Sequence, residues 1–129
     1  MPMVYKAESE EDFMAWVIDK LQLFGWRWYH THDSRRSEPG FPDITAAREG
    51  RLLFAELKRE GEWPDPDQVF WLDDLDKARA LRSHVPGIET IYVPEVYLWF
   101  PSDRDLILEA LQYVAQEPVT WFARKAQGP

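Results

Sequence analysis

The chain has 129 residues, no cysteine and no long apolar run. Without cysteine, disulfides and thiolate metal sites are excluded. No apolar run approaches the length of a membrane span, and the opening MPMVYKAESEED has neither the apolar nor the basic part of a signal peptide. We therefore expect a soluble, cytoplasmic protein with one domain over residues 1–129. Its core should cover about residues 8–115, and residues 117–129 should form a tail.

Basic residues are also in short supply, with 15 Lys and Arg against 23 Asp and Glu and a net charge of −8. Because phosphate contacts need Lys and Arg, this balance argues against simple electrostatic binding of nucleic acid. The charges are segregated, however. Residues 60–76 hold seven acids and no base, whereas residues 26–36 hold three arginines and one acid. Because the acidic protein has a basic segment, its net charge does not exclude a nucleic-acid partner.

Residues 40–58, GFPDITAAREGRLLFAELK, predict a β-hairpin. The mostly apolar runs 42–47 and 52–58 suit strands, and the polar segment 48–51 contains a glycine, as hairpin turns do. A two-residue loop at Glu49-Gly50 and a four-residue loop over 48–51 both place Asp43 opposite Glu56. Opposed side chains have Cβ atoms roughly 5 Å apart. Lys58, two residues beyond Glu56, should point to the same face.

Two opposed carboxylates repel each other unless a positive charge lies between them. Lys58 is one such charge, and Mg²⁺, which prefers carboxylate oxygens, is another. This group of side chains could bind the metal and direct a water at a phosphodiester. The plain alternative is a hairpin with an exposed charged face. The apolar neighbours Ile44, Leu53, Ala55 and Leu57 instead favour a buried hairpin, in which ionisable groups need a reason to be inside.

The segments Gly40-Phe41-Pro42-Asp43 and Glu56-Leu57-Lys58, followed by Gln68, resemble the motif of the PD-(D/E)xK nuclease superfamily, and most closely its VRR-NUC (virus-type replication–repair nuclease) family. Gly25-Trp26, Tyr29-His30 and residues 33–37 (DSRRS) are also similar to small phage and bacterial members. The resemblance covers about residues 8–110. It implies an α/β, restriction-endonuclease-like core, a mixed central β-sheet flanked by helices. The chain's own pattern gives the order α-β-β-β-α-β-β-α, which suits that core.

The resemblance further implies a Mg²⁺-dependent DNA endonuclease, with Mn²⁺ able to substitute, in a bacterial or phage-infected cell. It would act on branched DNA such as Holliday junctions or flaps, in repair, recombination or phage replication. Symmetric cutting of a junction would need a two-fold homodimer, because one small domain offers one active site. The implied metal ligands and catalytic residues are Glu10, Asp43, Glu56, the Leu57 carbonyl, Lys58 and Gln68. The implied nucleic-acid contacts are His30, Arg35 and Arg36.

The flanking pattern predicts a first helix over residues 10–24, capped by Ser9 and ended by Gly25. Its apolar stripe is Phe13, Val17, Leu21 and Phe24. Counting back seven residues from Val17 reaches Glu10, so this acid should adjoin the buried face, with Glu11 as the alternative. A short strand should follow over residues 26–30.

Asp65-Pro66-Asp67-Gln68 predicts the start of a second helix. Gln68 is then either a capping residue that needs no further function or, as the resemblance implies, a site residue that helps to hold the attacking water or the phosphate. Pro86-Gly87 should end that helix. Strands are expected over 88–93 and 96–100. A last helix should be capped by Ser102 and have an apolar side of Leu106, Ile107, Ala110, Leu111 and Val114. Trp121 and Phe122 should pack on this core or on a partner chain.

Two other functions remain open at this stage. One is a non-catalytic DNA-binding or assembly module on the same fold, which the acidic balance favours. The other is a nicking or restriction-like endonuclease acting on plain duplex. A zinc site at the alternate residues His30 and His32 is disfavoured, because cysteine is absent and no further histidine lies nearby.

Overall fold

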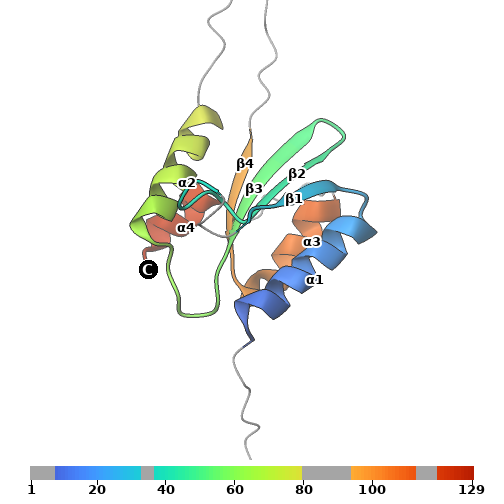
Figure 1. Ribbon diagram of the computed structural model, residues 1–129, viewed down its shortest axis with the longest axis horizontal. Coiled ribbons are helices and arrows are strands. Elements are labelled where there is room, and N and C mark those ends of the chain that lie inside the picture. The colour runs from blue at the N-terminus through green and yellow to red at the C-terminus, as the bar shows by residue number, and fades with distance from the viewer. Residues whose placement is uncertain (1–7, 33–36, 80–93, 113–118) are drawn as a thin grey trace, which may run out of the picture.

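Four strands form one sheet in the order β1-β2-β3-β4, with helices on both faces (Figure 1). The computed structural model describes residues 8–32, 37–79, 94–112 and 119–129. The strands are β1 (Arg27–His30), β2 (Ile44–Arg48), β3 (Arg51–Leu57) and β4 (Glu95–Trp99). β1, β2 and β3 pair antiparallel, whereas β4 runs parallel to β3. The protein is therefore an α/β domain with a mixed sheet, as predicted.

The hairpin of β2 and β3 has the predicted pairing. Arg48 pairs with Arg51 and Ile44 with Ala55. Glu49 and Gly50 have φ of 46° and 83°, the positive values that a two-residue type I′ turn requires. The same register continued by one residue places Asp43 opposite Glu56.

Helices α1 (Glu10–Leu23) and α3 (Arg104–Gln112) cover one face of the sheet (Figure 1). Ser9 caps α1 as predicted, because its hydroxyl accepts a hydrogen bond of 3.0 Å from the Asp12 amide. The apolar stripe of α1 belongs to one core with alternate residues of β3 and β4. The fully buried members of this core include Phe13, Val17, Leu21, Leu53, Ala55 and Leu57.

Helices α2 (Pro66–Arg79) and α4 (Trp121–Gln127) cover the other face at β4. The second core consists of Leu72, Val96, Leu98, Phe100 and Trp121. The predicted tail is therefore wrong for residues 121–127, which form a helix that is part of the fold. Trp121 is 1% exposed and its indole N–H donates to Asp73 Oδ1 at 3.0 Å. Phe122 is 70% exposed, so only one of the two aromatic residues packs on the core.

The approach to α3 also differs from the prediction. A 3₁₀ turn, η1 (Pro101–Asp103), follows β4, and α3 begins at Arg104. Asp103 accepts a hydrogen bond of 2.9 Å from the Phe100 amide, while Ser102 is exposed inside the turn. Ser102 is therefore not the cap, because the proline directs an extra turn before the helix. The predicted helix end at Pro86-Gly87, the strand over 88–93 and the apolar residue Val114 lie outside the described residues.

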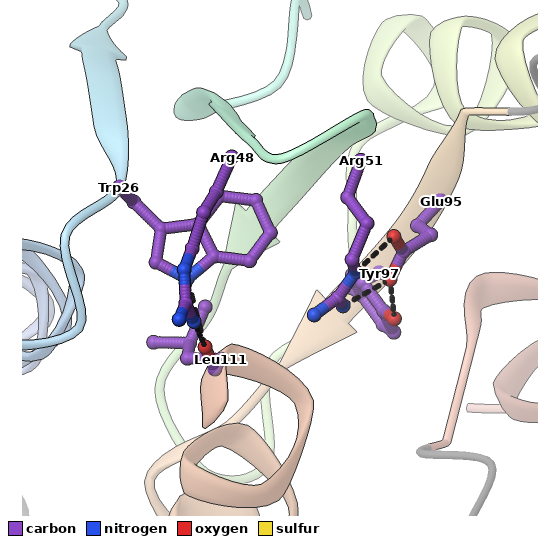
Figure 2. A network of polar contacts seen from close by, with 6 residues as sticks. All are labelled: Trp26, Arg48, Arg51, Glu95, Tyr97 and Leu111. Carbon is purple, nitrogen blue, oxygen red and sulfur yellow. Dashed lines mark hydrogen bonds and ion pairs between the residues drawn. The ribbon is translucent and has the colours of Figure 1, made fainter. Parts of the chain in front are cut away.

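Polar side chains fix the turn end of the hairpin (Figure 2). Arg51 donates two hydrogen bonds to Glu95, at 2.6 and 2.8 Å, and Glu95 also accepts from the Tyr97 hydroxyl at 2.5 Å. Trp26 and Arg48 both donate to the Leu111 carbonyl at 2.9 Å. These contacts hold β3 to β4 and α3 to the sheet. The described part of the chain includes no helix long and apolar enough to cross a membrane.

Candidate metal centre

Three carboxylates from three different elements meet at one end of the sheet. Glu10 comes from the first turn of α1, Asp43 immediately precedes β2, and Glu56 lies in β3. One carboxylate oxygen from each lies within 4.8 Å of the other two. The hairpin register predicted that Asp43 and Glu56 would meet, and the motif resemblance implied that Glu10 would join them. Glu11, the alternative acid of α1, is exposed and lies outside the group.

Glu56 is the most deeply buried of the three acids, with 1% of its surface exposed. Burial, together with the nearby charge of Asp43, raises the pKa of the Glu56 carboxyl to about 10. Its Oε1 accepts a hydrogen bond of 3.1 Å from the Gln68 amide, but its Oε2 is buried and has no hydrogen-bond partner among the described residues. A proton on Glu56 itself, shared with Asp43, a buried water or a cation would satisfy that oxygen. A divalent metal with oxygen ligands fits this donor set.

Lys58 supplies the positive charge beside the carboxylates and is itself only 8% exposed. Its backbone amide donates to the Trp99 carbonyl at 3.0 Å, which extends the pairing of β3 with β4 past Leu57. The Lys58 charge lowers the pKa of Glu56 and of Glu10, against burial and the charge of Asp43, which raise both. The net shift of the Glu10 pKa is upward. One lysine therefore offsets the repulsion among the carboxylates only in part.

Gln68 makes the capping contact and also contacts the carboxylate group. Its side-chain oxygen accepts a hydrogen bond of 2.8 Å from the Asp65 amide, which is the capping contact at the start of α2. Its side-chain nitrogen donates to Glu56. The capping contact fixes the amide orientation, so the nitrogen is directed at the carboxylate. The start of α2 therefore helps to position the Glu56 carboxylate.

Asp43 is held by backbone contacts on both sides. Its Oδ2 accepts a hydrogen bond of 2.8 Å from the Leu57 amide. The Thr31 amide donates to the Asp43 carbonyl at 2.9 Å, and the Thr31 hydroxyl donates to the Pro42 carbonyl at 2.6 Å. Sequence reasoning missed Thr31, because the long segment between β1 and β2 hides their register. The Leu57 carbonyl as a metal ligand stays a prediction.

Gly40 places the loop before Asp43 against the start of α2. Its φ is +84°, and a Cβ there would lie 2.5 Å from the backbone carbon of Asp67. Only glycine therefore fits this position. This contact explains the glycine of the GFPD motif by geometry alone.

Of the three predicted nucleic-acid residues, His30 lies in the described part of the chain. His30 is exposed, pairs with Ile44 and is not part of the metal-capable group. Among the described residues, His30 and His32 form no such group with any other side chain. Arg35 and Arg36 lie outside the described residues.

Comparison of the chain with protein-family models, with curated proteins and with solved structures gave no match. The case for a function therefore depends on the motif residues and on the geometry of the carboxylate group.

Proposed function

We propose that this protein is a divalent-metal-dependent DNA endonuclease of the PD-(D/E)xK superfamily, similar to its VRR-NUC family. The proposal includes a restriction-endonuclease-like core built on the four-stranded sheet. One observation carries it. Three carboxylates from separate elements meet within 4.8 Å of one another, and a buried Glu56 oxygen among them has no hydrogen-bond donor in the part of the chain that the structure describes. Such a group is costly to bury without a cation.

Glu10, Asp43 and Glu56 would hold Mg²⁺ or Mn²⁺, with the Leu57 carbonyl as a further ligand. When bound, the ion would polarise the scissile phosphate and lower the pKa of an attacking water. Lys58, which strand alternation assigns to the same face as Glu56, would position that water or stabilise charge on the phosphate. Gln68 keeps Glu56 in place through the hydrogen bond to Oε1.

The motif resemblance, rather than the geometry, supports branched DNA as the substrate and a homodimer as the form that cuts a symmetric junction. The test is incubation of the protein with junction, flap, duplex and single-stranded DNA, with Mg²⁺ or Mn²⁺. Asp43→Asn and Glu56→Gln should reduce cleavage by about 10²-fold or more, since each removes a ligand charge with little change of shape. Asp74→Asn, which changes an exposed acid of α2, is the control.

A second measurement tests the metal directly. Binding of the ion must displace the proton from Glu56, whose pKa is raised to about 10 in the metal-free protein. Titration calorimetry in two buffers of different ionisation enthalpy should show proton release on Mn²⁺ binding, and the affinity should rise with pH. Glu56→Gln should abolish the proton release.

A non-catalytic DNA-binding module is the second candidate, favoured by the net charge of −8. It predicts DNA binding without metal-dependent cleavage on any substrate of the panel. Wild-type protein that binds Mn²⁺ without proton release and cleaves nothing would support that candidate and contradict the nuclease.

A further inference from the structure

The sheet register aligns side chains in rows on the face that carries Asp43 and Glu56. Directly paired residues share a face, and alternate residues along a strand return to it. The first row is Thr31, Asp43, Glu56 and Leu98. The second is Tyr29, Thr45, Phe54 and Val96, and the third is Arg27, Ala47 and Leu52. The rows are roughly 7 Å apart, two residues along a strand.

Only part of this face is covered. Helices α2 and α4 pack against β4, and Phe41 lies edge-on to Phe54 at 6.0 Å, which closes the middle of the second row. On this face, the side chains of β1 and of the turn end of the hairpin are exposed to solvent. Tyr29 is 53% exposed and Leu52 41%, and Arg27 and Ala47 are also exposed. We call these four residues the open sheet face. Tyr29 begins the row next to Asp43, so this face is continuous with the carboxylate group.

We propose that the open sheet face binds a single-stranded stretch of DNA that leads into the carboxylate group, with a base stacked on Tyr29 and a phosphate on Arg27. The inference rests on the proposed nuclease function and names the form of its substrate beside the site. An exposed aromatic ring on a flat sheet is a stacking platform for unpaired bases. Arg27 is the charged member of the face and is cationic on a protein of net charge −8, so it suits a phosphate.

The composition and size of the face favour a DNA strand over a second copy of this chain. A standard protein interface uses about 20–30 residues on each side, whereas this face presents four. Tyr29 also lies edge-on to His32, with ring centroids 6.2 Å apart, so an exposed imidazole with polar edges adjoins the tyrosine ring past the end of β1.

The first test measures binding of a fluorescently labelled oligothymidine in metal-free buffer at low salt, where no cleavage occurs. Tyr29→Thr suits a strand and removes the ring, whereas Tyr29→Phe keeps it. Tyr29→Thr should weaken binding at least fivefold, the lower end of what one stacked base contributes. Tyr29→Phe should stay within about twofold of wild type. Phe122→Gln, which removes a comparably exposed ring from α4, is the matched control and should change nothing.

The second test is direct. An oligothymidine carrying 5-iodouracil should form a photo-crosslink to the peptide that contains Tyr29. Arg27→Gln should reduce the slope of log affinity against log salt by about one unit. Binding of a blunt duplex should be insensitive to Tyr29→Thr, because paired bases are not free to stack on the ring.

Several results would overturn the inference. One is that Tyr29→Thr leaves oligothymidine binding unchanged. Another is that Tyr29→Thr weakens binding of the duplex by the same factor. A third is that light scattering shows a wild-type dimer that Tyr29→Thr converts to a monomer. The outcome is separable from that of the proposed function. If binding depends on Tyr29 but the protein cleaves no substrate, the open sheet face stands as a DNA-binding surface and the nuclease proposal is wrong. If the protein cleaves DNA and neither cleavage nor binding changes when Tyr29 is replaced, the nuclease proposal stands and the open sheet face is not a DNA-binding surface.

Discussion

At the scale of single residues, Glu56 determines how the metal-free protein responds to pH. Its pKa is raised from 4.5 to about 10 by burial and by Asp43. A folded state that holds this proton more tightly than the unfolded chain loses stability as pH rises through that window. The stabilising contribution is complete below about pH 4.5 and falls steadily toward pH 10.

Glu56→Gln should therefore raise the melting temperature of the metal-free protein at pH 8 by several degrees, because about 1 kcal/mol corresponds to roughly 4 °C in a domain of this size. At pH 4.5 the variant should match wild type. The measurement is thermal unfolding monitored by circular dichroism across this pH range in the presence of a chelator. Glu11→Gln, at an exposed position of α1, should follow the wild-type curve. A parallel loss of stability at every pH would show that Glu56 is not held protonated.

At the scale of elements, the contact between the GFPD loop and α2 sets the position of Asp43. Gly40→Ala should cost about 2 kcal/mol or more, because the new Cβ meets the Asp67 backbone in addition to the strain of positive φ. Gly25→Ala provides the control, since its φ is +79° and nothing lies within 4 Å of the added atom. That variant should lose only about 1 kcal/mol.

Urea unfolding of both variants separates the clash from the backbone strain. Equal losses would mean that the loop moves away from α2 at little cost. A Gly40→Ala protein that remains folded should also bind Mn²⁺ more weakly, because the loop carries the Asp43 carboxylate.

Helix α4 is the second element whose role can be measured. Trp121→Ala should destabilise the protein by about 3 kcal/mol or more, as removal of a fully buried ring leaves a cavity. It also leaves Asp73 without one of its donors. Phe122→Ala, in the same helix but 70% exposed, should be nearly neutral. Equal melting temperatures of the two variants would mean that α4 is dispensable and that the segment behaves as a tail.

At the scale of the whole molecule, the question is how an acidic protein would hold a polyanion. Arg35 and Arg36, in a polar segment before the hairpin, are predicted to contact phosphates. Replacing both with Ala should weaken binding to every DNA sequence alike and flatten the salt slope by up to about two units. The check is a salt titration on one junction and one duplex of unrelated sequence. A loss confined to one sequence would indicate base contacts, and an unchanged slope would remove these arginines from the binding surface.

Local patterns in the sequence determined the hairpin, the first helix and the meeting of Asp43 with Glu56. The reason is that a two-residue turn with glycine fixes the register by counting, and alternation along each strand then fixes the face. The resemblance implied an acid of the first helix near the metal, and helical spacing favoured Glu10 over Glu11 for that place. Gln68 followed from capping chemistry, which depends on neighbours three residues apart.

Contacts between residues distant in sequence were decided only by the tertiary structure. The register of β1 with β2 crosses a long loop, so neither Thr31 nor the open sheet face could be counted from the sequence. α4 is too short to be stable as an isolated helix, and its packing depends on Trp121 reaching a core made by α2 and β4. The same holds for the charge state of Glu56. The sequence placed an acid opposite an acid, but only burial between the sheet and α2 removes the water that would keep both carboxylates ionised.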